Sequence, residues 1–324
     1  MRTRAVFYVA FLVIVAGLLI ARSAHHHPSI SSGLELAAKL NITNSVKKII
    51  YDSKDGYFYT ITNKGCFGWG RDGHCTIIES GSTSAVAFSR DGSTEAITTG
   101  KYLSVNRLHL HEASSPLTTV AVSNDGRWVA AGDGTNVLIL DGGSGELSQT
   151  LAQAGPVADV AFSPDGNLLA VVCTRAGTTD EYNDITVWDT GLGRVSYTLP
   201  ASSAVAFSED GTLVATGSTD KAIHLFEVNG GNPKQTLVGH SEPVQCLAFS
   251  PDSKTLASGG GDKVLHLWDL RSGRILATLT DAIPRTAAVP QGVTAVAFSP
   301  DGQVLAGAFG DGLTELWNCQ GANP

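Results

Sequence analysis

The segment from Gly239 to Leu279 reads GHSEPVQCLAFSPDSKTLASGGGDKVLHLWDLRSGRILATL, and this pattern decides the fold. An apolar run at 247–249 precedes a Pro-Asp-Ser turn, and a second apolar run follows at 255–258. A third run ends in Trp268-Asp269, and a glycine-containing turn leads to a fourth run at 274–279. Four short apolar runs separated by turn residues predict a four-stranded antiparallel unit.

The turn motif of this segment recurs along most of the chain. Equivalent positions of its first strand fall at 51, 88, 122, 162, 207, 249 and 298, so that the copies are about 41 residues apart. That period is the length of one four-stranded propeller blade. The sequence therefore predicts an all-β fold, a seven-bladed β-propeller of four-stranded antiparallel blades, over residues 34–324.

The same segment carries a resemblance to the WD-repeat (WD40) family, whose signature it matches at Gly239-His240, Ser258, Asp262 and Trp268-Asp269. The resemblance covers about residues 34 to 319. It implies a structural hydrogen-bond set made of His240, Ser258, Asp262 and Trp268. Other copies depart from the signature, since Phe226 and Leu140 stand where Trp is expected.

The last repeat supplies only three strands before the polar tail at 318–324. A missing outer strand would expose a sheet edge. The segment Leu34-Glu35-Leu36-Ala37-Ala38-Lys39-Leu40 has the character of a strand without a repeat of its own. We expect it to complete the last blade and to lock the ring.

The first 24 residues have the features of a membrane-targeting segment. Arg2 and Arg4 precede an uncharged run of 17 residues, Ala5 to Ala21, which predicts one N-terminal hydrophobic helix. The helix is either an uncleaved transmembrane anchor or a signal peptide, and Ala21-Arg22-Ser23 would allow cleavage before Ala24. Residues 25–33 form a linker. We expect the propeller to lie outside the cytoplasm, membrane-anchored or exported, with a cytoplasmic scaffold as the alternative.

Charge and cysteine usage narrow the choice of partners and compartment. The net charge is −8, and no basic run is longer than Lys47-Lys48, which argues against nucleic acid as a partner. None of the five cysteines forms a CxxC pair. Cys66 and Cys75 flank a turn at 70–73, so they are either a disulfide across a hairpin or two small strand residues.

Catalytic motifs are not apparent in the sequence. It contains no GxSxG, HExxH or P-loop motif, and nearly every aspartate falls at a repeat turn. His109 and His111 alternate beside Glu112 but lack a third ligand, and the linker run His25-His26-His27 lacks fixed geometry, so we expect no metal at either. We predict no catalytic, cofactor or metal site. The favoured function is a non-catalytic scaffold that binds a protein or ligand, and the alternative is a propeller enzyme such as a lactonase-like or metal-dependent hydrolase.

Two enlarged loops fall on the same face of the predicted ring. Counting strand reversals places the second-to-third loop of each blade and the blade-to-blade connections on one face, and the other turns opposite. The loops at 174–184 and 280–292 are both on the first face. Insertions there mark a binding face or are tolerated loop growth. The candidate partner-binding residues are Arg175, Asp180, Glu181, Tyr182, Pro284 and Arg285.

Overall fold

A computed structural model of the chain describes residues 35–41, 46–52, 56–62, 65–69, 75–80, 83–174, 184–200, 202–280, 292–310 and 312–319. Within these ranges every regular element is a β-strand, from β1 to β28. The same ranges contain no helix that is long and apolar enough to cross a membrane. The expected N-terminal helix at 1–24 and the linker at 25–33 lie outside the described residues.

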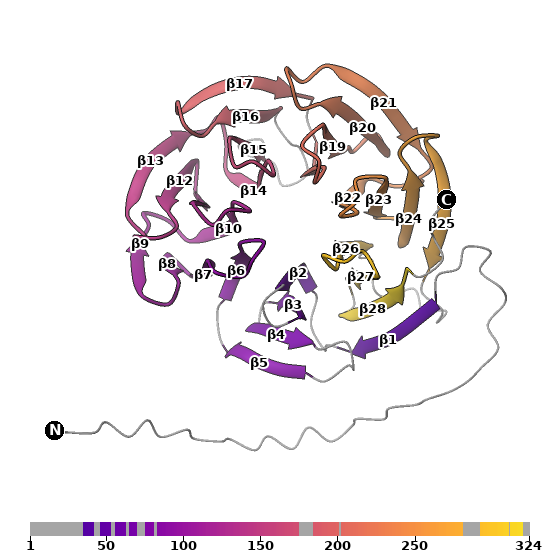
Figure 1. Cartoon of the computed structure of the whole chain (residues 1–324), viewed down its shortest axis with the longest axis horizontal. Coiled ribbons are helices and arrows are strands. Elements are labelled where there is room, and N and C mark those ends of the chain that lie inside the picture. The colour runs from indigo at the N-terminus through magenta and orange to yellow at the C-terminus, as the bar shows by residue number, and fades with distance from the viewer. Residues whose placement is uncertain are drawn as a thin grey trace. The chain divides into compact units, whose positions relative to one another are not determined.

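Seven four-stranded antiparallel sheets surround a common centre (Figure 1), which confirms the predicted seven-bladed propeller. The innermost strands are β2 (Val46–Asp52), β6 (Thr83–Phe88), β10 (Leu117–Val122), β14 (Val157–Phe162), β18 (Ala204–Phe207), β22 (Val244–Phe249) and β26 (Val293–Phe298). The second strands are β3 (Tyr57–Thr62), β7 (Glu95–Thr99), β11 (Trp128–Asp133), β15 (Leu168–Cys173), β19 (Leu213–Gly217), β23 (Thr255–Gly260) and β27 (Val304–Phe309).

The third strands are β4 (Gly65–Trp69), β8 (Tyr102–Val105), β12 (Asn136–Asp141), β16 (Ile185–Asp189), β20 (Ala222–Glu227), β24 (Val264–Asp269) and β28 (Leu313–Asn318). The outer strands are β5 (Cys75–Ser80), β9 (His109–Glu112), β13 (Leu147–Ala152), β17 (Arg194–Leu199), β21 (Pro233–Val238), β25 (Arg274–Thr280) and β1 (Glu35–Asn41). Blades are numbered 1 to 7 in the order of their innermost strands.

The ring closes by the predicted exchange of one strand. In blade 7 the strand order is β1-β28-β27-β26, so the first strand of the chain is the outer strand of the last blade. The antiparallel register runs from Glu35 opposite Asn318 to Asn41 opposite Leu313. At the same junction the Thr294 hydroxyl donates a hydrogen bond of 2.6 Å to the carbonyl of Val46 in blade 1. The clasp predicted from the strand count is therefore confirmed.

The hydrophobic core lies between the blades rather than at the centre of the ring. Trp268 of blade 6, for example, is buried in one apolar cluster with Leu213 and Ile223 of blade 5. At the closure, Phe58 of blade 1 is buried with Leu316 of blade 7. Each blade covers its neighbour's apolar face, so no blade can bury its core alone.

The repeated turn owes its sequence to a serine two residues before the aspartate. In each of the six described copies the serine hydroxyl donates to the aspartate at 2.6 or 2.7 Å and accepts a hydrogen bond from the backbone N–H five residues on. The pairs are Ser89–Asp91, Ser123–Asp125, Ser163–Asp165, Ser208–Asp210, Ser250–Asp252 and Ser299–Asp301. These aspartates are turn residues, as predicted.

The hairpin of blade 1 does not bring the two cysteines together. The register places Cys66 opposite Glu79 and Cys75 opposite Trp69, three positions apart, or about 10 Å along the strand. A disulfide needs Cα atoms within roughly 7 Å. The side chain of Cys66 is buried. Of the two alternatives, the structure favours two small strand residues.

Candidate functional site

The signature residues of blade 6 form a continuous hydrogen-bond chain from the surface to the core. His240 Nδ1 lies 2.9 Å from Asp262 Oδ2, and its Nε2 lies 2.8 Å from the Ser258 hydroxyl. Trp268 Nε1 donates to that hydroxyl at 2.8 Å. The set implied by the family resemblance is therefore assembled as expected, with Ser258 and Trp268 buried.

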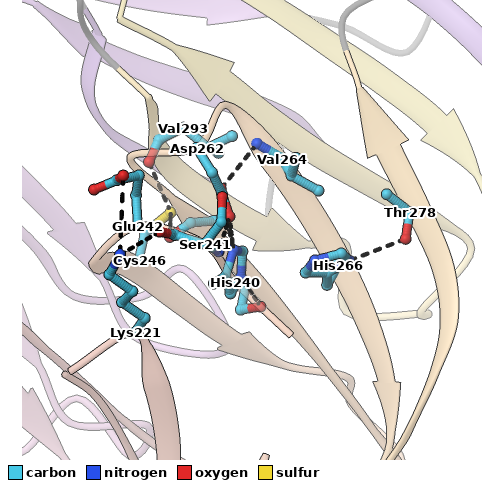
Figure 2. Close-up of polar contacts among 12 residues, drawn as sticks. Lys221, His240, Ser241, Glu242, Cys246, Asp262, Val264, His266, Thr278 and Val293 are labelled. Carbon is cyan, nitrogen blue, oxygen red and sulfur yellow. Dashed lines mark hydrogen bonds and ion pairs between the residues drawn. The ribbon is translucent and has the colours of Figure 1, made fainter. Parts of the chain in front are cut away.

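Backbone groups complete this network around Asp262, as the dashed lines of Figure 2 show. The carboxylate accepts hydrogen bonds from the N–H groups of Ser241 at 2.8 Å and Val264 at 3.2 Å. Burial favours the protonated acid, but these bonds and His240 outweigh it and lower the pKa of Asp262. The carboxylate is thus kept ionised by its hydrogen bonds, and Asp262 has a structural role in this network.

Two glycines make room for this network. A Cβ at Gly239 would lie 2.8 Å from the Trp268 ring, and a Cβ at Gly260 would lie 2.7 Å from His240 Nδ1. The Gly-His pair of the signature therefore has a steric reason. Gly260 was not singled out from the sequence, because the glycine run at 259–261 reads equally well as a turn.

His266 stacks on the same network without joining it. Its ring lies 4.6 Å from that of His240, and its Nδ1 is 3.0 Å from the Thr278 hydroxyl. Burial, with a further contribution from His240, lowers the pKa of His266 to about 4. The imidazole is therefore neutral at physiological pH and acts as a packed ring.

A cavity of ≈ 310 Å³ opens at the centre of the ring, lined by the first residues of all seven innermost strands. Its charged lining residues are Lys47, Lys48 and Asp159. Antiparallel pairing puts this mouth on the face that carries the second-to-third loops and the blade-to-blade connections. The cavity therefore opens on the face predicted to bind.

One ion pair spans this mouth. Lys48 of blade 1 lies 3.4 Å from Asp159 of blade 4, and the Thr119 hydroxyl of blade 3 donates to the same carboxylate oxygen at 3.1 Å. A second pair joins turns of opposite blades on the other face, where Arg90 of blade 2 lies 3.0 Å from Glu209 of blade 5. Both pairs skip two blades, so each links strands or turns across the ring.

The six loop residues predicted to bind a partner lie outside the described residues. They are Arg175, Asp180, Glu181, Tyr182, Pro284 and Arg285. Their described anchors are Cys173 at the end of β15 and Val293 at the start of β26, and both lie on the face where the innermost strands begin. His109 and His111 are half-buried on β9, and the described part of the chain holds no cluster of three metal-binding side chains.

A family model and several known proteins match parts of this chain. The family model described as "WD domain, G-beta repeat" matches residues 100–139, 145–189, 193–227, 231–269 and 286–318, more than half of the chain. The chain therefore belongs to the WD40 repeat β-propeller family.

Several proteins share part of the repeat region. The chain is 31% identical over 132 residues to COMPASS component SWD3 of Saccharomyces cerevisiae, covering 39% of this chain and 40% of that protein. It is 32% identical over 92 residues to WD repeat-containing protein 91 homolog of Dictyostelium discoideum, covering 27% of this chain and 12% of that protein. Against WD repeat-containing protein 55 of Rattus norvegicus it is 30% identical over 109 residues, 32% of this chain and 27% of the relative. The chain thus spans less than half the length of each.

Family membership and these relatives place the chain among the WD40 propeller scaffolds. They do not support the alternative of a lactonase-like or metal-dependent hydrolase.

Proposed function

We propose that this chain is a scaffold, held at a membrane or exported by residues 1–24, that captures a protein partner on the face where the innermost strands begin. The choice of face rests on the charged central cavity, whose lining residues lie near the starts of the innermost strands. The enlarged loops at 174–184 and 280–292 belong to the same face by strand count. One relative is a component of COMPASS, which favours a protein as the partner.

The capture experiment uses affinity purification of the full chain from native membranes. Shortening 175–183 or 281–291 should abolish recovery of the partner while leaving the melting temperature unchanged, because surface loops contribute little to stability. The matched controls are Arg127→Ala and Lys254→Ala, on the opposite face. Capture that survives both deletions but fails in the controls would move the binding site to the other side of the ring.

The proposed location rests on the basic start, the apolar run Ala5 to Ala21 and the triplet that follows. Protease added to intact cells, or to spheroplasts of a double-membraned host, should digest the propeller. A propeller that stays protected until the inner membrane is lysed, or that fractionates as a soluble cytosolic protein, would establish the alternative of a cytoplasmic scaffold.

A further inference from the structure

The central cavity has an excess of positive charge in an otherwise acidic chain. Among its lining residues Lys47 and Lys48 are cations and Asp159 is the one anion, whereas the chain as a whole has net charge −8. Lys47 is exposed, and within the described part of the chain its side chain makes no hydrogen bond or ion pair. The mouth therefore presents one uncompensated ammonium group to an incoming molecule.

Three of the four hydroxyl groups that line the cavity, those of the threonines, are already used by the fold, and the fourth belongs to Ser84. Thr118 donates to the carbonyl of Val157, and Thr294 donates to the carbonyl of Val46, each joining neighbouring blades. Thr119 donates to Asp159. These groups stabilise the ring, so the lysines are the groups left to select a ligand by charge.

The ion pair across the mouth is loose enough to exchange. Its 3.4 Å separation exceeds the 2.7–2.9 Å typical of a charge-assisted hydrogen bond. The side chains of Lys48 and Asp159 are 34% and 37% exposed, and exposed pairs of this kind stabilise a fold little. A carboxylate from outside could replace that of Asp159 beside Lys48 at small expense in stability.

We propose that this mouth binds an acidic side chain, Asp or Glu, of a protein partner between Lys47 and Lys48, and that Asp159 is an internal competitor which the incoming carboxylate displaces. The proposal rests on the proposed function, because it names the chemistry of the partner at the same face. It also gives the ion pair between Lys48 and Asp159 a regulatory role. Asp159 lowers the affinity of the mouth for every acidic ligand and prevents the binding of those that bind weakly.

Two substitutions in the same ion pair should change the affinity for an acidic ligand in opposite directions. This distinguishes a role in binding from a purely structural role. Asp159→Asn keeps an oxygen to accept the Thr119 hydrogen bond but frees Lys48, whereas Lys48→Met removes the cation. Loss of the ion pair as a structural contact would shift both variants in the same direction. Competition for Lys48 shifts them in opposite directions.

The probe is a fluorescein-labelled hexaglutamate peptide, titrated with the purified full-length chain in detergent and followed by fluorescence anisotropy. Asp159→Asn should bind about five- to tenfold more tightly than the wild type, and Lys48→Met and Lys47→Met about tenfold more weakly. The binding should weaken as salt is raised. Arg90→Met and Glu209→Gln, which break the second cross-ring pair on the opposite face, are the matched controls and should leave the affinity unchanged.

Weaker hexaglutamate binding by Asp159→Asn, or preference of the wild type for hexalysine, would overturn the proposal in favour of a cationic ligand. Equal competition by free glutamate and unlabelled hexaglutamate would overturn the assignment to a protein partner. If the wild type recovers a partner from membranes but hexaglutamate binding ignores Lys47 and Lys48, the acidic-ligand proposal is wrong and the scaffold function stands. If no partner is recovered, the scaffold function itself is wrong, whatever the peptide does.

Discussion

His240 bonds to two polar side chains and so joins Ser258 of β23 to Asp262 in the turn that follows it. If its Nδ1–H donates to Asp262, its Nε2 accepts the hydroxyl proton of Ser258, which in turn accepts from Trp268. The hydrogen bonds then all run in one direction, from Trp268 to Ser258 to His240 to Asp262, and each of these side chains has a partner. An imidazole so engaged at both nitrogens has no free position for general-base chemistry.

Replacing His240 should therefore destabilise the fold strongly. His240→Ala leaves the Ser258 hydroxyl and the Asp262 carboxylate without this partner, and we expect a loss of about 1–3 kcal/mol in the free energy of unfolding. His111→Ala on the half-buried strand β9 is the control and should lose much less. Urea denaturation of both variants measures the difference. Equal losses would remove the special structural role of His240.

The turn of blade 6 contains a residue that its backbone does not favour. Ser253 has φ 57°, in the left-handed region, where the other described copies of this turn have glycine, such as Gly302 at φ 68°. Its hydroxyl accepts a hydrogen bond from the N–H of Asp210 at 3.0 Å, which offsets part of the strain. The position is thus a compromise between backbone conformation and an inter-blade contact.

Exchanging the two residue types should change stability in opposite directions. Ser253→Gly should stabilise the domain by about 0.5 kcal/mol, because relief of roughly 1 kcal/mol of strain exceeds the loss of an exposed hydrogen bond. Gly302→Ser should destabilise it by about 1 kcal/mol, since a Cβ there has space but the wrong φ. Thermal melts of both variants test this. A destabilised Ser253→Gly would mean that the hydrogen bond dominates.

The hydrogen-bond set of blade 6 and the ion pair at the cavity differ in how well the sequence predicts them. His240, Ser258, Asp262 and Trp268 could be predicted, because local repeat spacing fixes where each falls on its strand. The contact between Lys48 and Asp159 could not, because it joins residues 111 positions apart through the curvature of the whole ring. In the sequence Lys47-Lys48 stood out only as the longest basic run.

Among the elements, β1 has the largest effect on closure for its length. It adds the outer strand to blade 7, and its seven residues join the first and last parts of the chain. The closure could be predicted by counting strands. The last repeat has three strands and the segment upstream of the first repeat belongs to no repeat, so that segment must be the missing outer strand. The burial of β14 is lower than its apolar sequence indicates. Ala161 and Phe162 on β14 are only partly buried, because the innermost strand has an open edge at the channel.

Deleting residues 1–41 should lower the melting temperature of the whole propeller, because it removes β1 and exposes the edge of β28. Deleting only 1–30 is the matched control and should leave the melting temperature unchanged, since it keeps β1 in blade 7. Calorimetry of both truncations measures the effect. Equal melting temperatures for the two would show that the clasp contributes nothing to stability.

The hairpin of blade 1 yields a redox prediction. Because its register separates Cys66 from Cys75 by three positions, a strong reductant should leave the melting temperature of the purified chain unchanged. Mass spectrometry after alkylation under denaturing conditions should find both cysteines labelled without prior reduction. Labelling that requires reduction would show that this hairpin adopts another register.

At the scale of the molecule, three of the repeated turns, those of Asp91, Asp165 and Asp210, make the propeller sensitive to acid. Hydrogen bonds from Ser89 and Ser93 hold the pKa of Asp91 down at about 2, against an ordinary 3.8. At Asp165 and Asp210 burial opposes ionisation, but hydrogen bonds from the serine and the turn backbone outweigh it and lower the pKa. Several blades thus contain a carboxylate whose ionised form the fold prefers.

The sign of the pH dependence follows from these lowered pKa values. Above about pH 5 the carboxylates are ionised in both states, and their stabilising effect is complete. Below that pH the unfolded chain takes up protons while Asp91 in the folded turn remains ionised until about pH 2, so stability falls across this window. The melting temperature of Asp91→Asn should be lower than that of the wild type at pH 7. The difference between the two melting temperatures should disappear as the pH approaches 2. Because short hydrogen bonds are screened far less than long-range repulsion, 0.5 M NaCl should leave that convergence in place. A gap that stays constant down to pH 2, or that vanishes in salt at pH 7, would assign the acid sensitivity to net charge rather than to the turns.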